Sequence, residues 1–300
     1  MIPYATPAYA RTCAHLGTPR TLPRSGVTVL VRPVANAFGA LDACAPYPLL
    51  HAPDLTAFAA DLVAARDLVS FVGVADPLAT ASPEVLAEAF PDRLVAFKRH
   101  HLARLDPRDP LAHVHAGHRR KARRAAEHAR VEVVAEPLLH ATEWVRLYGA
   151  LRARHGALGP ADFPPEALVA QLAVPGALLV RVAEGDHAVS MSLWYFDGAR
   201  AHYHLGASDA RGYALDASYA GFAHALGALA QRGVRTVDLG GAAGGRDRDD
   251  GLARFKRGWA NDSATAWLCG RVLDPARYRV LSADVTADDW FPAYRAAVAA

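Results

Sequence analysis

Cysteine, methionine and long apolar runs are scarce in this chain of 300 residues. The three cysteines, Cys13, Cys44 and Cys269, are far apart and form no C-x-x-C pair, which argues against a disulfide framework and against a cysteine-rich zinc site. No run approaches the ~18 apolar residues of a membrane span, and the first residues lack the basic and apolar regions of a secretory signal. We therefore expect a cytoplasmic protein with reduced thiols.

Several catalytic and binding signatures are also missing. The chain has no G-x-S-x-G elbow and no Cys/His signature, so nothing in it indicates a covalent intermediate. The glycine-rich stretch 240–251 lacks the G-K-[ST] of a P-loop, and no helical pattern follows its glycines at once, as a dinucleotide turn requires. His113, His115 and His118 have no metal-ligand company, and we expect no metal.

Positive charge is concentrated in one band. Ten of the 33 Lys and Arg residues, but only three of the 30 Asp and Glu residues, lie between Lys98 and Arg130. Such a band attracts phosphates of a nucleotide, a nucleic acid or a diphosphate-linked substrate. Alternatively, these charges form the solvent-exposed face of an ordinary helix, and the sequence favours neither interpretation.

Hydrophobic periodicity predicts alternating helices and strands, and hence an α/β (α+β) fold. In the first half we expect a helix after Asp54, a buried strand at 68–74 and a basic helix at 113–129. In the second half two helices precede three strands, which are separated by the hairpin signals Gly185-Asp186 and Asp197-Gly198. A long helix with an apolar stripe at 215–229, a short strand at 234–239 and a terminal helix at 288–299 complete the prediction.

Five stretches carry a resemblance to known proteins: 119–125, 131–133, 154–156, 237–241 and 250–259. Together they resemble the Fem-type (FemABX) family and the related GNAT-like CelD/BcsL group. The Fem-type proteins are non-ribosomal peptidyltransferases that move an amino acid from aminoacyl-tRNA to a peptidoglycan precursor or a peptide. The most specific match is 237–241 (VDLGG) followed by 250–259 (DGLARFKRGW), and weaker matches are 119–125 (RRKARRA) with 131–133 (VEV), and 154–156 (RHG).

This resemblance implies two tandem GNAT-like domains with a cleft between them. Residues 1–136 together with about 272–300 would form the first domain, on the acceptor side. Residues 137–271 would form the second, on the acyl-donor side. The chain lacks the helical coiled-coil arm of some members, which leaves room for a small soluble peptide as acceptor.

The resemblance also implies where the acyl donor binds. Lys256 matches the family lysine that is proposed to hold the tRNA 3′ end and to stabilise the charge of the transition state. Phe255, Arg254, Gly240 and Gly241 surround it in the same motif. The reaction needs no cofactor, because the ester of the aminoacyl-tRNA co-substrate is already activated, and positioning and oxyanion stabilisation supply the acceleration.

Each of these positions also has a structural interpretation. Lys256 could be a surface lysine paired with Asp249 or Asp250, and Phe255 could belong to the core. The glycine-rich loop could be a simple connection.

Further candidates lie outside that motif. Asp238 ends a strand and could orient or deprotonate the incoming amine. Arg154, Arg120 and Arg124 are expected to bind the acceptor or phosphate, and Tyr203 could reach the cleft. A structural carboxylate and ordinary surface arginines are the alternatives at these positions.

Two other functions remain open from the sequence. The first is a CoA-dependent N-acyltransferase with acyl-CoA as donor. Its [RQ]-x-x-G-x-[GA] pyrophosphate loop is only partly matched by 208–216 (SDARGYALD). The second is a non-catalytic RNA-binding protein on this scaffold.

Overall fold

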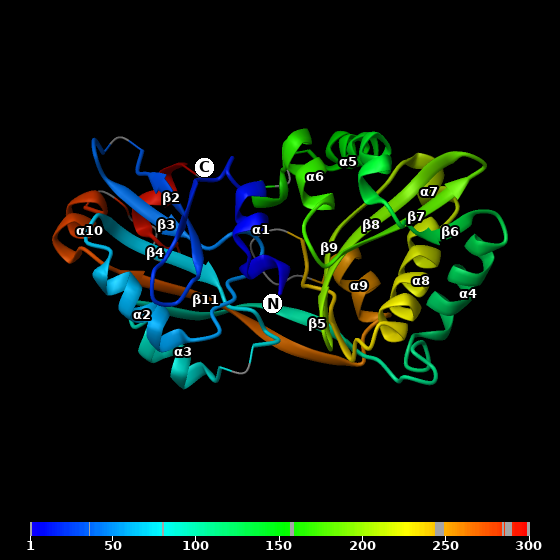
Figure 1. The fold of residues 1–300 in the computed structure, drawn as a ribbon, viewed down its shortest axis with the longest axis horizontal. Coiled ribbons are helices and arrows are strands. Elements are labelled where there is room, and N and C mark those ends of the chain that lie inside the picture. Colours follow the sequence, from blue (N-terminus) through cyan, green and yellow to red (C-terminus); the bar gives the residue numbers. More distant parts are fainter. Residues whose placement is uncertain are drawn as a thin grey trace. The chain divides into compact units, whose positions relative to one another are not determined.

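The structure is a computed structural model that describes residues 2–35, 37–79, 81–156, 159–243, 249–283, 285 and 290–298. The chain divides into two compact units (Figure 1). Unit 1 consists of residues 1–3 and 98–265, and unit 2 consists of residues 4–97 and 266–300. Within the described residues, no helix combines the length and the apolar character that crossing a bilayer demands.

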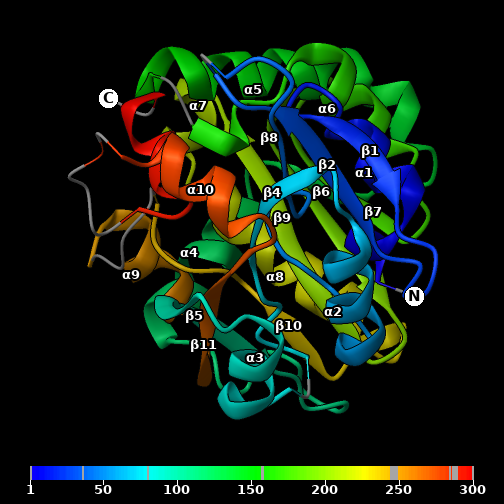
Figure 2. The ribbon, with the colours of Figure 1, turned by 90° about the vertical axis from the view of Figure 1, so that its left-hand side faces the viewer.

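Unit 2 contains a sheet in the order β1-β2-β3-β4-β11, in which β3 and β4 are parallel and the other neighbours antiparallel. Its elements are α1 (Pro7–Thr12), β1 (Thr18–Thr21), β2 (Thr28–Pro33), β3 (Leu41–Cys44), α2 (Leu55–Ala64), β4 (Leu68–Val74), α3 (Pro83–Ala89), the second part of β11 (Asp262–Val272), α10 (Pro275–Leu281) and the 3-10 helix η4 (Ala293–Val298). Helices α2 and α3 lie side by side, as Figures 1 and 2 both show. The rings of Phe58, Phe71 and Phe90 form the centre of the core of this unit.

Unit 1 is built on a sheet in the order β5-β10-β9-β8-β7-β6. Its elements are β5 (Arg93–Arg104, shared with unit 2), α4 (Ala116–Ala126), β6 (Arg130–Val133), η2 (Pro137–His140), α5 (Ala141–His155), η3 (Gly159–Ala161), α6 (Pro165–Leu172), β7 (Ala177–Glu184), β8 (His187–Asp197), β9 (Arg200–Ser208), α7 (Ala210–Ala214), α8 (Ala217–Gln231), β10 (Thr236–Asp238) and α9 (Gly251–Arg257). Strand β10 is parallel to β9 and antiparallel to β5.

Helices cover both faces of the unit 1 sheet. Successive residues of a strand point to opposite faces, and Trp194 and Tyr195 of β8 show where each face packs. The Trp194 ring contacts Phe222 of α8, with a centroid distance of 4.9 Å, and the Tyr195 hydroxyl donates to the Gln171 carbonyl of α6 at 3.0 Å. Helix α8, with α4 beside it, therefore covers one face, and α6 covers the other.

The α/β fold predicted from the sequence is confirmed, and the two hairpins lie where their turn signals placed them. Strands β7, β8 and β9 are connected at Gly185 and Gly198, both with positive φ. Residues 244–248 of the glycine-rich loop, and residues 288, 289 and 299 of the expected terminal helix, lie outside the described residues. In place of that helix, 293–298 form a 3-10 helix.

The compact units differ from the partition expected from the sequence. Residues 98–136 were expected in the first domain, but β6 pairs with β7 along its whole length and α4 packs against α8. These contacts join that segment to the residues that follow it. Whether the two units take the acceptor and donor sides stays a prediction.

A partly buried ion pair holds α5 to the hairpin of unit 1. The Arg181 guanidinium donates to both carboxylate oxygens of Glu143, each at 2.8 Å, and the same carboxylate accepts the Ala188 amide at 3.1 Å. The hydrogen bonds from Arg181 are the largest of the effects that lower the pKa of Glu143 to about 2. The Glu143 carboxylate is therefore charged in the folded protein at neutral pH.

We predict that Glu143→Gln destabilises unit 1 by about 2 kcal/mol at pH 7, because it leaves Arg181 with an uncharged partner. A carboxylate with a depressed pKa contributes stability above its unfolded pKa and loses it as the pH falls through its folded pKa. The deficit should therefore shrink between pH 4.5 and about pH 2. Urea unfolding of the variant and of the exposed control Glu166→Gln measures it, and a deficit independent of pH would contradict the assignment.

Candidate functional site

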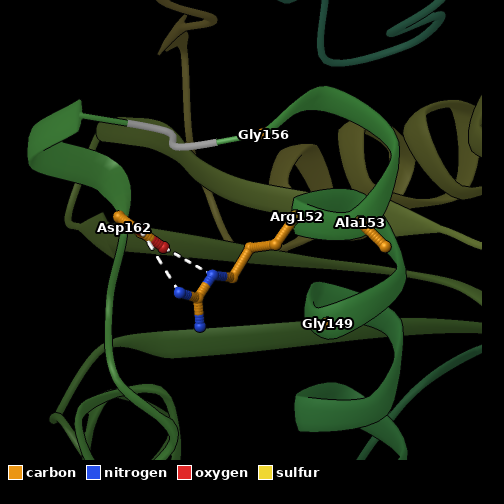
Figure 3. A pocket seen from close by; sticks show the side chains of 5 residues that line it. All are labelled: Gly149, Arg152, Ala153, Gly156 and Asp162. Atoms are coloured by element: carbon orange, nitrogen blue, oxygen red, sulfur yellow. Dashed lines mark hydrogen bonds and ion pairs between the residues drawn. The ribbon is translucent and has the colours of Figure 1, made fainter.

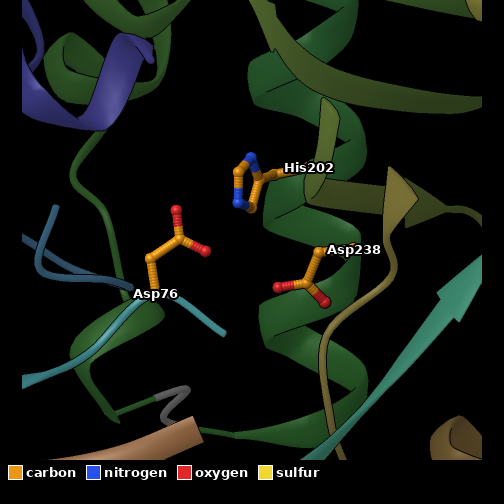
Figure 4. Close-up of side chains that lie close together, drawn as sticks. All are labelled: Asp76, His202 and Asp238. Carbon is orange, nitrogen blue, oxygen red and sulfur yellow. The ribbon is translucent and has the colours of Figure 1, made fainter. Parts of the chain in front are cut away.

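The candidate site lies where β10 ends, on one face of the unit 1 sheet. In the sheet register Asp238 is opposite Leu102 of β5 and His202 of β9. Register partners point to the same face, and Figure 4 shows the His202 ring and the Asp238 carboxylate extending from neighbouring strands. His100, two residues before Leu102, shares this face as well.

Asp238 is the buried acceptor of the group, with 2% of its surface exposed. The Nδ1 atom of His100 lies 2.8 Å from one carboxylate oxygen and 3.1 Å from the other, and the Gly240 amide donates to the same carboxylate at 2.7 Å. Burial alone would raise the pKa of Asp238, but His100, His202 and the Gly240 amide outweigh it and hold this pKa below its ordinary value. The carboxylate is therefore charged at neutral pH.

Lys256 reaches the same place from helix α9. The helix begins after Asp250, whose side chain accepts the Ala253 amide at 2.7 Å and so caps the helix. Lys256 lies one turn further along and is 6% exposed, with its Nζ donating to the Gly241 carbonyl at 2.8 Å. Its Nζ also lies 5.6 Å from the centroid of the Tyr203 ring. The surface ion pair that the sequence left open is not what the structure contains.

Burial lowers the pKa of Lys256 to about 8. The charge of Asp238 opposes this shift, whereas the nearby charge of Lys98 adds to it. The ammonium therefore remains mainly protonated at neutral pH, in an environment that strengthens its interaction with any negative charge placed beside it.

The two glycines allow the chain to pass close to Lys256 and to β5. Gly240 has φ +77°, and a Cβ there would lie 2.9 Å from the Nζ of Lys256. A Cβ at Gly241 would lie 2.9 Å from the carbonyl oxygen of Arg99. Lys98 donates to the next carbonyl, that of Ala242, at 3.2 Å. The segment 240–242 is thus held between two lysines. A side chain at Gly240 would displace the Lys256 ammonium, and a side chain at Gly241 would push the segment away from β5.

The structure brings together five of the residues predicted for the site: Lys256, Asp238, Gly240, Gly241 and Tyr203. Phe255 is in the same helix as Lys256, but its ring packs in the core cluster, 4.7 Å from Phe222 and 5.0 Å from Tyr219 between centroids. These contacts favour the core interpretation of Phe255 over stacking on a base.

The predicted arginines lie elsewhere, and none contacts Asp238 or Lys256 within the part of the chain that is described. Arg254 is exposed on α9 and donates to the Asp249 carbonyl at 2.8 Å. Arg154, at the end of α5, lies over the Tyr213 ring at 4.2 Å. Arg120 and Arg124 are exposed on α4, and Arg124 donates to Asp216 at 3.3 Å.

Two shallow hollows lie on the same helices, α4 and α5, but none of the predicted arginines lines them. A groove of about 540 Å³ between α4 and α8 has an apolar floor and two basic side chains. Its lining comprises Leu111, Ala116, Arg119, Ala122, Arg123, Ala126, Val131, Ala220, Ala223 and His224. A second hollow of about 440 Å³ lies at the end of α5, where Arg152 is paired with Asp162 at 2.7 Å (Figure 3).

His100 and His202 are members of the group that the sequence did not predict, and His100 is the one bonded to Asp238. It lies in a strand with no motif around it, and only the antiparallel pairing of β5 with β10 places it beside Asp238. The strand β5 runs without interruption from Arg93 to Arg104, so His100 lies in its interior.

Comparison with known proteins agrees with this fold. Residues 112–257 match the family model described as an acetyltransferase (GNAT) domain. No curated protein matches the sequence.

Three solved structures are similar over nearly the whole chain. FemX has a TM-score of 0.69 at 14% identity and covers 92% of this chain and 93% of its own. The C-terminal domain of a putative lysylphosphatidylglycerol synthetase from Agrobacterium fabrum has a TM-score of 0.60 at 16% identity, with 90% and 88% covered. L-PGS from Bacillus licheniformis has a TM-score of 0.57 at 12% identity, with 92% and 94% covered. Residues 112–257 are thus similar to a GNAT domain, and the chain has the fold of these three structures, as its sequence motifs predicted.

Proposed function

We propose that this protein is an aminoacyltransferase that moves an aminoacyl group from aminoacyl-tRNA to the amine of a peptide or cell-wall precursor, forming an amide bond. The observation that carries the proposal is the buried ammonium of Lys256, held at Gly241 and electrostatically coupled to Asp238. Lys256 lies at the motif position of the family lysine that is proposed to hold the tRNA 3′ end and to stabilise the charge of the transition state. The name of one similar structure, a lysylphosphatidylglycerol synthetase, denotes a product that carries an aminoacyl group.

The proposed chemistry is attack of a neutral amine on the carbonyl carbon of an ester. Negative charge develops on the carbonyl oxygen, and a preorganised cation in a water-poor site stabilises it. An ammonium has three N–H donors, and the bond to the Gly241 carbonyl uses one of them. The remaining donors could meet the developing oxyanion. The ester is already activated, so the proposal needs no cofactor.

Contacts at the start of α8 disfavour the CoA-dependent alternative. The partial pyrophosphate motif contains Arg211 and Gly212, but Arg211 is paired with Glu184, and a Cβ at Gly212 would collide with the Val189 carbonyl at 2.1 Å. Helix α8 begins after Asp216. The Asp216 side chain makes no capping hydrogen bond to the helix and pairs with Lys121 at 3.0 Å and Arg124 at 3.3 Å. Its negative charge, immediately before the helix, disfavours a phosphate at this N-terminus.

We predict that Lys256→Met abolishes transfer without unfolding the protein. Loss of one charge-stabilising donor at a transition state costs about 10²–10³-fold in rate, and methionine retains most of the buried volume. Turnover of labelled aminoacyl-tRNA with a mixture of dipeptides as acceptors measures the rate. Arg66→Met, at an exposed arginine of unit 2, is the control. If the Lys256→Met variant transfers at the wild-type rate, the proposed role of Lys256 is wrong.

The same assay tests the RNA-binding alternative. If the wild-type protein binds aminoacyl-tRNA and the aminoacyl group never leaves the tRNA, that alternative is right.

The same variant should change how stability depends on pH. A lysine whose folded pKa is about 8 binds its proton less tightly than in the unfolded chain, where the pKa is 10.5. The unfolded state therefore carries more protons between these values, and the free energy of unfolding rises with pH, by at most about 1.4 kcal/mol per pH unit. Lys256→Met should lack this contribution in urea unfolding measured from pH 7 to pH 10, whereas the control Arg66→Met should keep it.

We predict that tRNA binding depends on α4. Replacing Arg120 and Arg124 by glutamine should weaken binding and reduce the slope of log K against log salt by about 1.5, the value for two lost phosphate contacts. Filter binding at several salt concentrations measures the slope. Arg66→Gln, at an exposed arginine of unit 2, is the control. An unchanged slope would remove these two residues from the interface.

We predict that calorimetric titration with acetyl-CoA gives no saturable binding at micromolar concentrations, because the N-terminus of α8 carries Asp216. Asp216→Ser removes this charge and tests the reason directly. Tight binding by the wild-type protein would contradict the proposal and identify acyl-CoA, in place of aminoacyl-tRNA, as the donor.

A further inference from the structure

We propose that His100 is a second catalytic residue of this site: it takes the proton from the attacking amine and passes it to the leaving oxygen. This inference rests on the proposed aminoacyl transfer and deepens it. It assigns to a histidine–aspartate pair the acid–base role for which the sequence offered Asp238 alone.

The first support is the fixed orientation of the His100 ring. Its Nδ1 lies 2.8 Å and 3.1 Å from the two oxygens of Asp238, which is charged. A carboxylate only accepts hydrogen bonds, so we assign the proton of the neutral ring to Nδ1. The other nitrogen, Nε2, then carries a lone pair. An aspartate that holds an imidazole in this tautomer is the arrangement that makes histidine a base in hydrolases.

The second support is the accessibility of the ring. Among the described residues, the hydrogen bonds of the His100 side chain all run from Nδ1 to Asp238, and none involves Nε2. The side chain is nonetheless 10% exposed. A histidine held on one side and unpartnered on the other is suited to exchange a proton with a bound molecule.

The third support is the position of His100 relative to Lys256. The His101 amide donates to the Gly240 carbonyl at 3.1 Å, and the Leu239 amide donates to the His101 carbonyl at 2.9 Å. These two bonds fix β5, at the residue after His100, against residues 239–240. The carbonyl of the following residue, Gly241, accepts the hydrogen bond from Lys256. The base and the cation therefore flank one short segment. That is what amide formation requires, since the proton leaves the nitrogen while charge develops on the carbonyl oxygen.

The proposed step balances as follows. The neutral amine nitrogen forms a bond to the ester carbonyl carbon, and the carbonyl π electrons move to the oxygen beside the Lys256 ammonium. Nε2 of His100 takes one proton from that nitrogen, and Asp238 stabilises the imidazolium. The carbonyl then re-forms, the bond between carbon and the ribose oxygen breaks with its electron pair on oxygen, and Nε2 returns the proton to that oxygen. The products are an amide and a free ribose hydroxyl.

His100→Asn tests this proposal, because the asparagine amide can still donate to Asp238 from the position of Nδ1 while Nε2 is removed. Two nucleophiles are compared on labelled aminoacyl-tRNA, with the uncatalysed rates subtracted. Dipeptide amines must lose a proton as they react, whereas hydroxylamine is less basic and needs far less help. We expect kcat with dipeptides to fall ~10²–10³-fold, the range of general-base catalysis, and the rate with hydroxylamine to fall much less. The exposed His187→Gln variant is the control.

The outcomes are distinguishable. If His100→Asn retains wild-type transfer to dipeptides, or if both nucleophiles are impaired equally, His100 is not the base, and the aminoacyltransferase assignment stands. If His100→Ala regains dipeptide transfer when imidazole is added, the role of Nε2 is supported independently. If the wild-type protein transfers to neither nucleophile, the proposed function itself fails. Binding of tRNA by His100→Asn should remain within ~2-fold of wild type, because the histidine acts on the amine and not on the donor.

Discussion

The hydrogen bond from the buried Lys256 ammonium to the Gly241 carbonyl is the constraint on which the rest of the site depends. A buried cation needs polar partners, and here a backbone carbonyl supplies one at 2.8 Å. To present that carbonyl, the chain must turn immediately after β10, which Gly240 achieves with φ +77°. The same turn brings the Gly240 amide to the Asp238 carboxylate. One local backbone shape therefore positions the cation and the anion together.

The alternation of side chains along the strands separates chemistry from packing. Val237 points into the core formed with α8, and Asp238, the next residue, points to the opposite face with His100 and His202. A register shift of one residue between β5 and β10 would place Val237 beside His100 and send the carboxylate into the core. The orientation of the Asp238 carboxylate is thus fixed by the same strand pairing that stabilises the sheet.

The sequence predicts local features well and distant pairing poorly. The hairpins at Gly185 and Gly198 and the apolar stripe of α8 follow from short-range patterns, and the structure has them. The pairing of β6 with β7, in which Arg130 lies opposite Ala183 and Val133 opposite Val180, could not be predicted, because no local pattern encodes a contact across such a sequence separation. His100 was missed for the same reason. Its importance arises only from a strand pairing across a large sequence separation.

Lys256 and Asp238 are electrostatically coupled but form no direct ion pair among the described residues, and this arrangement matters for the proposed chemistry. In a direct ion pair, the Asp238 carboxylate would neutralise much of the charge of Lys256. The ammonium would also compete with His100 for hydrogen bonds to the Asp238 oxygens. Instead, the lysine donates to a neutral carbonyl, so most of its positive charge stays uncompensated in a buried environment, and the carboxylate is left to hold the imidazole. Burial lowers the pKa of Lys256 to about 8, and the nearby charge of Asp238 opposes that shift. Under the proposed mechanism, this separation leaves the ammonium free to face a developing oxyanion while Asp238 holds the His100 ring, whereas a direct ion pair between Lys256 and Asp238 would occupy both groups.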